Sequence, residues 1–389
     1  MYISKLASLS QPNILQVLEE KKVKLAEKGV DIINLSAGTP DRPPAEHVMK
    51  AISEASLAPQ NYKYTLIDPP HLIEAVINWY KTRYGVEISS EEMLSIYGSQ
   101  EGFTHIFHAL CDKDDLVIAG TPGYPIFFYG PLMAGAQVYK TPLLPQNNFL
   151  IDFDSIPVDI AKKARVIIAS YPSNPLGAVA GIDFYERLIA FAKKYDIIVI
   201  HDNAYSEFVH DGKPAGSFLA VPGAKDVGIE FNSLSKSYNL TGLRISFALG
   251  NKKIIGAFKK LRTNFDYGLS SLDHSAAIAS LTGPQDIVRQ NREAYRDRRN
   301  AFCAALIKNG WNVPMTPASM FTWFPLPESY PVKESEQFCM DLLEKTGVIC
   351  VPGSSFGEGG ENYLRFALIQ PPERLETAAN RIGEYLRHF

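Results

Sequence analysis

Two serines, a lysine and an arginine lie close together in the stretch FNSLSKSYNLTGLR. Ser233 and Ser235 stand three residues and one residue before Lys236, and Arg244 stands eight residues after it. Hydroxyls and a guanidinium can bind a phosphate, and a lysine among them can be one more phosphate contact or a nucleophilic amine. The same residue types are also common in solvated loops. The surrounding elements must therefore decide between a chemical site and an ordinary turn.

Four apolar runs of the sequence each end in polar groups. The run GIEF leads into the lysine stretch just described. The run SIY is followed by Ser99 and Gln100, VIIAS by Asn174, and IIVI by Asp202 and Tyr205. Because ligands of an open parallel sheet bind at the carboxyl ends of its strands, four consecutive strand ends loaded in this way predict a ligand site.

The order of apolar runs and helical patterns predicts the fold class. Short strand-like runs alternate with polar turns and helical segments through the first 280 residues, which favours a mostly parallel sheet covered by helices on both faces. From 286 to 310 the pattern is that of one long amphipathic helix, and short strands and helices mix after it. We therefore predict a large α/β domain at 46–280 and a smaller α+β domain formed by 1–45 and 281–389.

Composition and charge argue against several classes of partner. Lys and Arg number 39 and Asp and Glu 42, a net charge of −3, and there is no basic run, so we expect neither nucleic acid nor an anionic membrane as partner. No apolar stretch approaches the ~20 residues that span a bilayer. The first fifteen residues, MYISKLASLSQPNIL, lack the apolar core of a signal peptide. We therefore predict a cytoplasmic protein.

The only pattern that suggests a metal site is THIFHALCD. His105, His108 and Asp112 fall on one face of a predicted helix, opposite the apolar residues of the same segment. A solvent or subunit-contact face explains this spacing better than metal ligation, so no metal is expected. The four cysteines form no C-x-x-C pair and are typical of buried thiols in a reducing compartment.

A phosphate is the first ligand group that the strand ends suggest. YGSQEG leads from a strand into a helix, and the free N–H groups at the start of a helix suit a phosphate, although Gly-Ser also begins ordinary helices. Ser233, Ser235 and Arg244 could add two hydroxyls and a charged fork to the same phosphate.

The remaining polar groups suit a ring that carries this phosphate. Asp202, unless it is a solvated turn residue, can pair with a protonated ring nitrogen, and Asn174 and Tyr205 can bind a ring oxygen. Tyr124 in TPGYP can stack on the ring or simply pack on the core. A phosphate, an aldehyde for Lys236, a phenolic oxygen and a pyridine nitrogen together describe pyridoxal 5′-phosphate.

At this point the sequence resembles the class I/II aminotransferases of PLP fold type I, over essentially its whole length. GSQEG, PGYP, YPSNPLG, HDNAYSE and SLSKSYNLTGLR occur in the family's order. NLSAGTPD resembles the N-terminal substrate loop, with Gly38 as its glycine, and YLRFAL resembles the strand whose arginine, here Arg365, grips the substrate α-carboxylate. Within the family the chain looks most like LL-diaminopimelate aminotransferases and their alanine- or aspartate-using relatives.

The resemblance implies a role for each matching residue. Lys236 carries the cofactor as a Schiff base and serves as general base and acid, Asp202 holds the ring nitrogen, and Tyr205 assists catalysis. The implied substrate contacts are Gly38, Asn174 and Arg365. The implied cofactor contacts are Ser99, Gln100, Tyr124, Asn174, Asp202, Tyr205, Ser233, Ser235, Lys236, Arg244 and Tyr64.

The implied activity is transfer of an amino group between an L-amino acid and a 2-oxo acid, with LL-diaminopimelate, alanine, aspartate or glutamate as candidate donors. A carbon–sulfur β-lyase on the same fold would share nearly all these residues and is the alternative. A non-catalytic PLP-binding regulator fits less well, because the chain has no basic segment or spare length for a DNA-binding region.

Three segments depart from the family pattern. Leu176 stands where threonine is usual, and Gln100 stands where the diaminopimelate group often has lysine. The stretch NYKYTLIDPPHLIEA departs most, with Asp68 at the position of a usual glycine. Either Tyr62 or Tyr64 would reach the phosphate of a neighbouring subunit, so we expect a homodimer.

Overall fold

The computed structural model describes residues 3–8, 14–212 and 214–389. Part of the N-terminal stretch on which the predicted location rests therefore lies outside the described residues. Within those ranges, no helix combines the length and the apolar character needed to cross a membrane. The cytoplasmic location stays a prediction.

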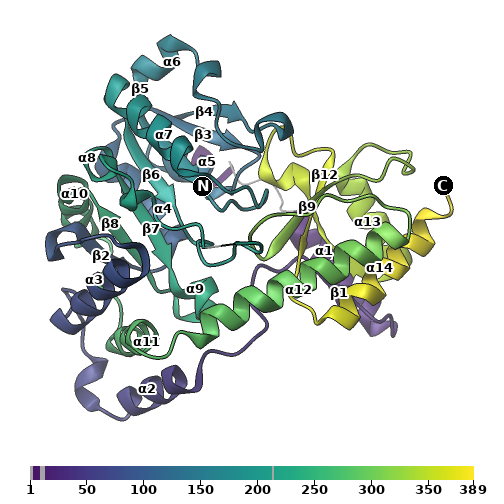
Figure 1. Ribbon diagram of the computed structural model, residues 1–389, viewed down its shortest axis with the longest axis horizontal. Helices are drawn as coiled ribbons and strands as arrows, with labels where there is room; N and C mark the ends of the chain where they lie inside the picture. The colour runs from purple at the N-terminus through teal and green to yellow at the C-terminus, as the bar shows by residue number, and fades with distance from the viewer. Residues whose placement is uncertain (1–2, 9–13, 213) are drawn as a thin grey trace.

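A seven-stranded sheet forms the centre of the larger part of the molecule (Figure 1). Its strands are β2 (Met93–Ile96), β3 (Leu116–Thr121), β4 (Gln137–Pro142), β5 (Ala164–Ser170), β6 (Ile198–Asp202), β7 (Gly228–Ser233) and β8 (Ser246–Gly250). Their order is β2-β8-β7-β6-β5-β3-β4, and β8 alone runs antiparallel to its neighbours. Because all the other strands share one direction, β2, β5, β6 and β7 end at the same edge, as the sequence predicts.

Alternate residues of each strand enter two separate apolar layers. In β5, Val166 and Ile168 pack into one layer, whereas Ile167 and Ala169 pack into the other. Helices cover both faces: α2 (Glu46–Ser56), α3 (Pro70–Tyr84), α4 (Ser99–Leu110), α5 (Ile126–Met133), α6 (Val158–Lys163), α7 (Ile182–Tyr195), α8 (Ala224–Val227), α9 (Leu234–Ser237), α10 (Lys252–Arg262) and α11 (Ser271–Thr282). Burial on both faces explains why these strands are continuous apolar runs, and the predicted α/β class is confirmed.

The C-terminal part of the chain builds a second layer around a smaller sheet. The smaller sheet has the order β11 (Val351–Pro352), β12 (Tyr363–Ala367) and β9 (Phe321–Pro325), and β10 (Val348–Ile349) belongs to a separate two-stranded sheet. The helices of this layer are α12 (Asp286–Lys308), α13 (Ser335–Thr346) and α14 (Pro372–Leu386). The N-terminal strand β1 (Ile33–Asn34) pairs with β10, and α1 (Ile14–Glu27) packs on α13. We keep the division into domains at 46 and 280 as a proposal, which this pairing of the two chain ends supports.

The long helix that the sequence predicts is α12, which has 23 residues. Figure 1 shows it running from the region of α11 to the layer that contains α14. The helix α4, in contrast, ends at Leu110. Asp112 therefore lies beyond α4, and the expectation that it shares a helical face with His105 and His108 is wrong. Within the described ranges, no group of three or more His, Cys, Asp or Glu could hold a metal ion.

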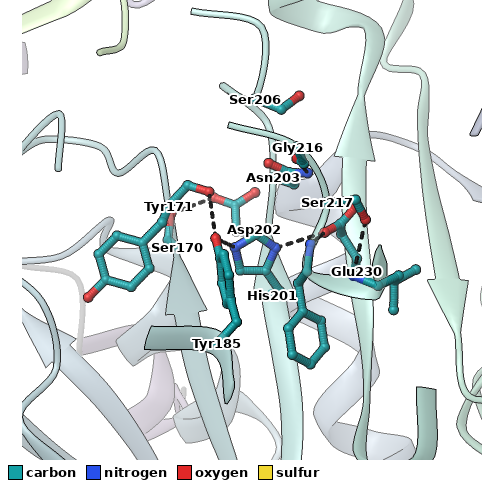
Figure 2. A network of polar contacts seen from close by, with 12 residues as sticks. Ser170, Tyr171, Tyr185, His201, Asp202, Asn203, Ser206, Gly216, Ser217 and Glu230 are labelled. Carbon is teal, nitrogen blue, oxygen red and sulfur yellow. Dashed lines mark hydrogen bonds and ion pairs between the residues drawn. The ribbon is translucent and has the colours of Figure 1, made fainter. Parts of the chain in front are cut away.

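A fully buried carboxylate, Glu230 of β7, ties several elements together. Its oxygens accept hydrogen bonds from the Tyr80 hydroxyl at 2.9 Å, the Ser217 hydroxyl at 2.8 Å and the Phe218 N–H at 2.8 Å. His201 Nδ1 lies 2.9 Å from the same carboxylate, across the pair of strands β6 and β7 (Figure 2). The carboxylate thus links α3, β6 and the turn that begins at Ser217.

We predict that Glu230→Gln lowers the free energy of unfolding of the cofactor-free protein by about 2–4 kcal/mol. The amide NH₂ cannot accept from these donors, and each buried group left without a partner costs about 1–3 kcal/mol. Urea denaturation would measure the change, with Glu186→Gln on the exposed side of α7 as the control. Equal stability of the two variants would contradict the prediction.

Candidate active site

A cavity of about 1280 Å³ opens where the carboxyl ends of the large sheet meet the smaller layer. The predicted residues that line it are Gly38, Ser99, Gln100, Tyr124, Asn174, Asp202, Tyr205, Ser233, Ser235, Lys236, Arg244 and Arg365. Tyr64 lies elsewhere on its own chain, with its ring exposed and 4.8 Å from the ring of Tyr267. The structure therefore brings all the predicted residues except Tyr64 to one cavity, and the role of each is a proposal.

The start of α4 forms one end of the cavity. Gly98 precedes α4 with a φ of 82°, and a Cβ atom built there would lie 2.4 Å from Arg244 Nη2. Glycine is required for both reasons, because other residues avoid this φ and would displace the guanidinium. The free N–H groups of α4 and the Arg244 guanidinium therefore converge, an arrangement that suits a phosphate.

Hydroxyl groups surround the same end of the cavity. Ser233 caps the short helix α9, and its Oγ accepts the Ser235 N–H at 3.1 Å. The Ser233 O–H makes only a long contact, 3.5 Å, to the Ile245 carbonyl, so it can donate to an anion instead. Ser99 and Ser235 line the cavity beside it.

Lys236 lies between this anion-binding end and the N-terminal substrate loop. Its Nζ donates a hydrogen bond to the carbonyl oxygen of Gly38. Burial, together with the positive charges of Arg244 and Arg365, lowers the pKa of Lys236 to about 8. More of the amine is neutral near neutral pH than in an ordinary lysine, and a neutral amine can act as nucleophile or base. The sequence leaves two roles open for Lys236, a phosphate contact and a nucleophilic amine. The lowered pKa favours the nucleophilic amine.

Asp202 has one satisfied oxygen and one unsatisfied oxygen. The Ser170 hydroxyl donates to Asp202 Oδ2 at 3.1 Å, as Figure 2 shows, while Oδ1 is buried and has no partner in the described part of the chain. Burial raises the pKa of Asp202 to about 6, although the Ser170 hydroxyl, the His201 side chain and the nearby Ala204 N–H each act to lower it. A buried carboxylate oxygen calls for a donor. A protonated pyridine nitrogen is such a donor, so the site fits pyridoxal 5′-phosphate at this position.

Arg365 reaches the cavity from β12 in the smaller layer. Its Nη1 donates to Asn174 Oδ1 and its Nη2 to the Ser36 carbonyl, both at 3.0 Å, whereas Nε is buried without a partner in the described ranges. The guanidinium lies 4.1 Å from the centre of the Phe321 ring and 4.8 Å from that of Phe356. Burial lowers the pKa of Arg365 to about 10, which leaves it charged at neutral pH and able to bind a carboxylate.

Two tyrosines complete the wall near the ring position. Burial raises the pKa of Tyr205, so its hydroxyl stays protonated and can donate a hydrogen bond. The Tyr124 hydroxyl donates to Gln100 Oε1 at 2.8 Å, which fixes the Tyr124 ring beside the start of α4. The Gln100 side chain thus positions an aromatic ring.

Sequence reasoning misses four residues of the site: Ser36, Ser170, Phe321 and Phe356. Ser170 is the last residue of the run VIIAS, so the rule that finds Asn174 could have found it as well. Ser36 contributes only its backbone carbonyl, which carries no sequence signal. Phe321 and Phe356 occur in apolar stretches of the smaller layer, where an aromatic residue is normally part of the core.

The sheet order, with a cavity at its carboxyl edge, is that of PLP fold type I. A family model described as aminotransferase class I and II matches residues 30–382. An LL-diaminopimelate aminotransferase of Dehalococcoides mccartyi is 39% identical, with 99% of both chains covered. One from Aquifex aeolicus is 40% identical over 95% of this chain and 96% of its own. The substrate-bound BacF structure from Bacillus subtilis has 35% identity and a TM-score of 0.94, covering 99% of this chain and 98% of its own.

The chain therefore belongs to the aminotransferase class I and II family and is an enzyme. This finding confirms the predicted family, fold class and reaction type. It also removes the non-catalytic regulator from consideration.

We predict that Asp202→Asn stabilises the cofactor-free protein near neutral pH. The folded pKa of about 6 lies above the ordinary value of 3.8, so the stability contributed by Asp202 is present at low pH and is lost as the pH rises through about 6. Removing the charge should raise the free energy of unfolding at about pH 8 by an amount on the order of 3 kcal/mol.

Urea denaturation of the wild type and the variant across a pH series would measure this difference, with the exposed Asp154→Asn as the control. The gain should shrink as the pH falls below about 6. A variant that is less stable than the wild type at every pH of the series would contradict the claim that the buried charge of Asp202 destabilises the cofactor-free protein.

Proposed function

We propose that this enzyme holds pyridoxal 5′-phosphate and moves an amino group between an L-amino acid and a 2-oxo acid. The unpartnered Asp202 Oδ1, in the same cavity as the Lys236 amine and the Arg365 guanidinium, is the observation that carries the proposal. These three groups match a ring nitrogen, an aldehyde and an α-carboxylate. LL-diaminopimelate, the substrate named for the relatives from Dehalococcoides and Aquifex, is one candidate donor.

The phosphate would bind at the start of α4. The N–H groups there, the Arg244 guanidinium and the hydroxyls of Ser99, Ser233 and Ser235 supply the donors. Lys236 would carry the cofactor covalently through Nζ.

The ring would lie between the phosphate and β6. Asp202 Oδ1 would accept from its nitrogen, and Asn174 and Tyr205 would bind its oxygen. Tyr124 would cover one face, held by its hydrogen bond to Gln100.

When bound, the cofactor accepts the electron pair that remains after the substrate α-proton is removed. Lys236 Nζ takes that proton and delivers it to the carbon of the cofactor that receives the amino group. Its lowered pKa suits both taking up and giving up a proton. The negative charge of Asp202 keeps the ring nitrogen protonated. Arg365 holds the α-carboxylate through its free Nε and a neighbouring Nη, which places the α-carbon beside Lys236.

The fate of the amino nitrogen separates this activity from that of a β-lyase. With a nitrogen-15-labelled amino donor and a 2-oxo acid, we expect the label in the amino acid formed from the acceptor. Lys236→Ala should keep the cofactor but lower turnover by about 10²–10⁴-fold, because the positioned base is gone. The exposed Lys50→Ala serves as the control.

Mass spectrometry after borohydride reduction should find the cofactor on Lys236 of the wild type and nowhere on the variant. Release of the label as free ammonia would instead support the carbon–sulfur β-lyase. Cofactor on another lysine, or normal turnover of Lys236→Ala at full occupancy, would refute the role of Lys236.

We also propose that the functional unit is a homodimer. An exposed apolar ridge runs beside the cavity and consists of Tyr62, Tyr64, Leu66, Ile67, Phe265 and Tyr267. It adjoins the cavity wall, since Phe265 stacks on the His105 ring at 4.4 Å. An apolar patch of this kind is typical of an interface. The Tyr62 hydroxyl is bound within its own chain to the Ser56 carbonyl at 2.7 Å, so Tyr64 is the better candidate to enter the neighbouring site.

Analytical ultracentrifugation of the holoenzyme should show a dimer. Ile67→Lys should weaken the dimer and the activity together, because a lysine would be buried in the interface, whereas Val158→Lys at an exposed position on α6 should change neither. A monomer with full activity would refute the proposal.

A further inference from the structure

Every cationic side chain that lines the cavity in the described part of the chain already has a partner in the proposed function. Arg244 faces the phosphate position, Lys236 the aldehyde and Arg365 the α-carboxylate. The imidazole of His105 also lines the cavity, and its Nδ1 is bound to Glu101. A second carboxylate, at the end of a substrate side chain, would meet no unpaired positive charge from these residues.

The acidic side chains that line the cavity are also paired with other groups. Glu101 contacts His105 and also accepts the Tyr97 N–H at 3.2 Å. Glu19 of α1, at the mouth, forms an ion pair with Lys22. Asp202 faces the ring nitrogen. A second ammonium on the substrate would therefore find no free carboxylate among these residues. Each charged group of the cavity is already paired with another residue, the cofactor or the α-carboxylate, so the substrate side chain need not carry a charge.

The wall next to the α-carboxylate position is apolar. Phe321 and Phe356 lie against the Arg365 guanidinium at 4.1 and 4.8 Å. Phe321 also borders the substrate loop, because a Cβ atom on Gly38 would lie 3.3 Å from its Cζ. Val351 lines the same wall, paired with Arg365 across β11 and β12. A side chain that leaves the α-carbon here meets mainly aromatic rings and methyl groups. The Ser355 hydroxyl, next to Phe356, also lines the cavity and has no partner among the described residues.

The ridge that a second copy of the chain would bring is also apolar. Between 62 and 67 its only charged residue is Lys63, and both Leu66 and Ile67 are exposed. Occupation of this face by a second copy would add to the apolar character of the site.

We infer that the amino donor of this enzyme has a large uncharged side chain, apolar or aromatic, and that LL-diaminopimelate is a poor donor. The inference rests on the proposed function, since it takes Arg365 as the α-carboxylate site. LL-diaminopimelate ends in an ammonium and a carboxylate, and the cavity would strip water from both without supplying a partner to either. An apolar side chain gives up no hydrogen bonds to water on entry, and its burial is favourable.

The test is the half-reaction of the holoenzyme, followed by the absorbance change of the cofactor. L-Phenylalanine, L-leucine and L-methionine are compared with L-glutamate, L-aspartate and LL-diaminopimelate, with L-alanine as the reference. We expect kcat/KM for the best apolar donor to exceed that of each charged donor by about 10-fold or more. Faster reaction with LL-diaminopimelate or glutamate would overturn the inference and leave the proposed function intact. Failure of every donor, alanine included, would instead refute the proposed function.

A matched pair of variants tests the physical reason. Ser355 lines the cavity, whereas the Ser354 hydroxyl is exposed and donates to Glu336 at 2.9 Å. Ser355→Lys adds an uncommitted cation and should raise kcat/KM for glutamate relative to phenylalanine by about 10-fold, while Ser354→Lys should leave this ratio unchanged.

Thr39→Lys, at an exposed position that lines the cavity, provides a second added cation if Ser355→Lys does not fold. Lys63→Ala should leave the ratio unchanged. Folded cation variants that keep the original ratio would overturn the inference, as would a loss of glutamate activity in Lys63→Ala.

Discussion

The site is organised around a buried carboxylate oxygen that has no hydrogen-bond partner among the described residues and therefore requires a donor or a cation. Asp202 sits at the end of β6, where burial raises its pKa to about 6. The parallel pairing of β5 with β6 places Ser170 directly beside it, and the Ser170 hydroxyl satisfies Oδ2. Oδ1 is left for a ligand. A protein with no ligand here would gain stability by exchanging this aspartate for an uncharged residue, so its presence indicates a site built for a cation.

The positive charges of the cavity impose a complementary demand. Lys236, Arg244 and Arg365 come from different elements and approach one another in one cavity, and the two guanidinium groups help to lower the pKa of Lys236. In the proposed complex, a phosphate near Arg244 and a carboxylate near Arg365 would relieve their repulsion. In the ligand-free site, burial and these two charges together lower the pKa of Lys236 to about 8, near the pH at which its amine can exchange protons. Binding and chemistry thus rest on one arrangement of charges.

Sequence reasoning succeeds where the geometry of the sheet determines the outcome. Asn174, Asp202 and Lys236 are far apart in the chain, yet parallel strands bring their ends to one edge, so their proximity follows from the apolar runs before them. It fails where tertiary packing decides. Nothing in the pattern around Phe321 shows that its ring would cover an arginine from another strand. Asp112 looks like a continuation of α4 until the helix is seen to end at Leu110.

The central claim is that Asp202 is present to keep the ring nitrogen of the cofactor protonated. The most direct measurement is the nitrogen-15 NMR shift of holoenzyme loaded with pyridoxal 5′-phosphate labelled at the ring nitrogen, recorded at about pH 8, where the free aromatic nitrogen would be less protonated. We expect the shift of a protonated pyridine in the wild type and of a neutral pyridine in Asp202→Asn. A neutral ring nitrogen in the wild type would contradict the account.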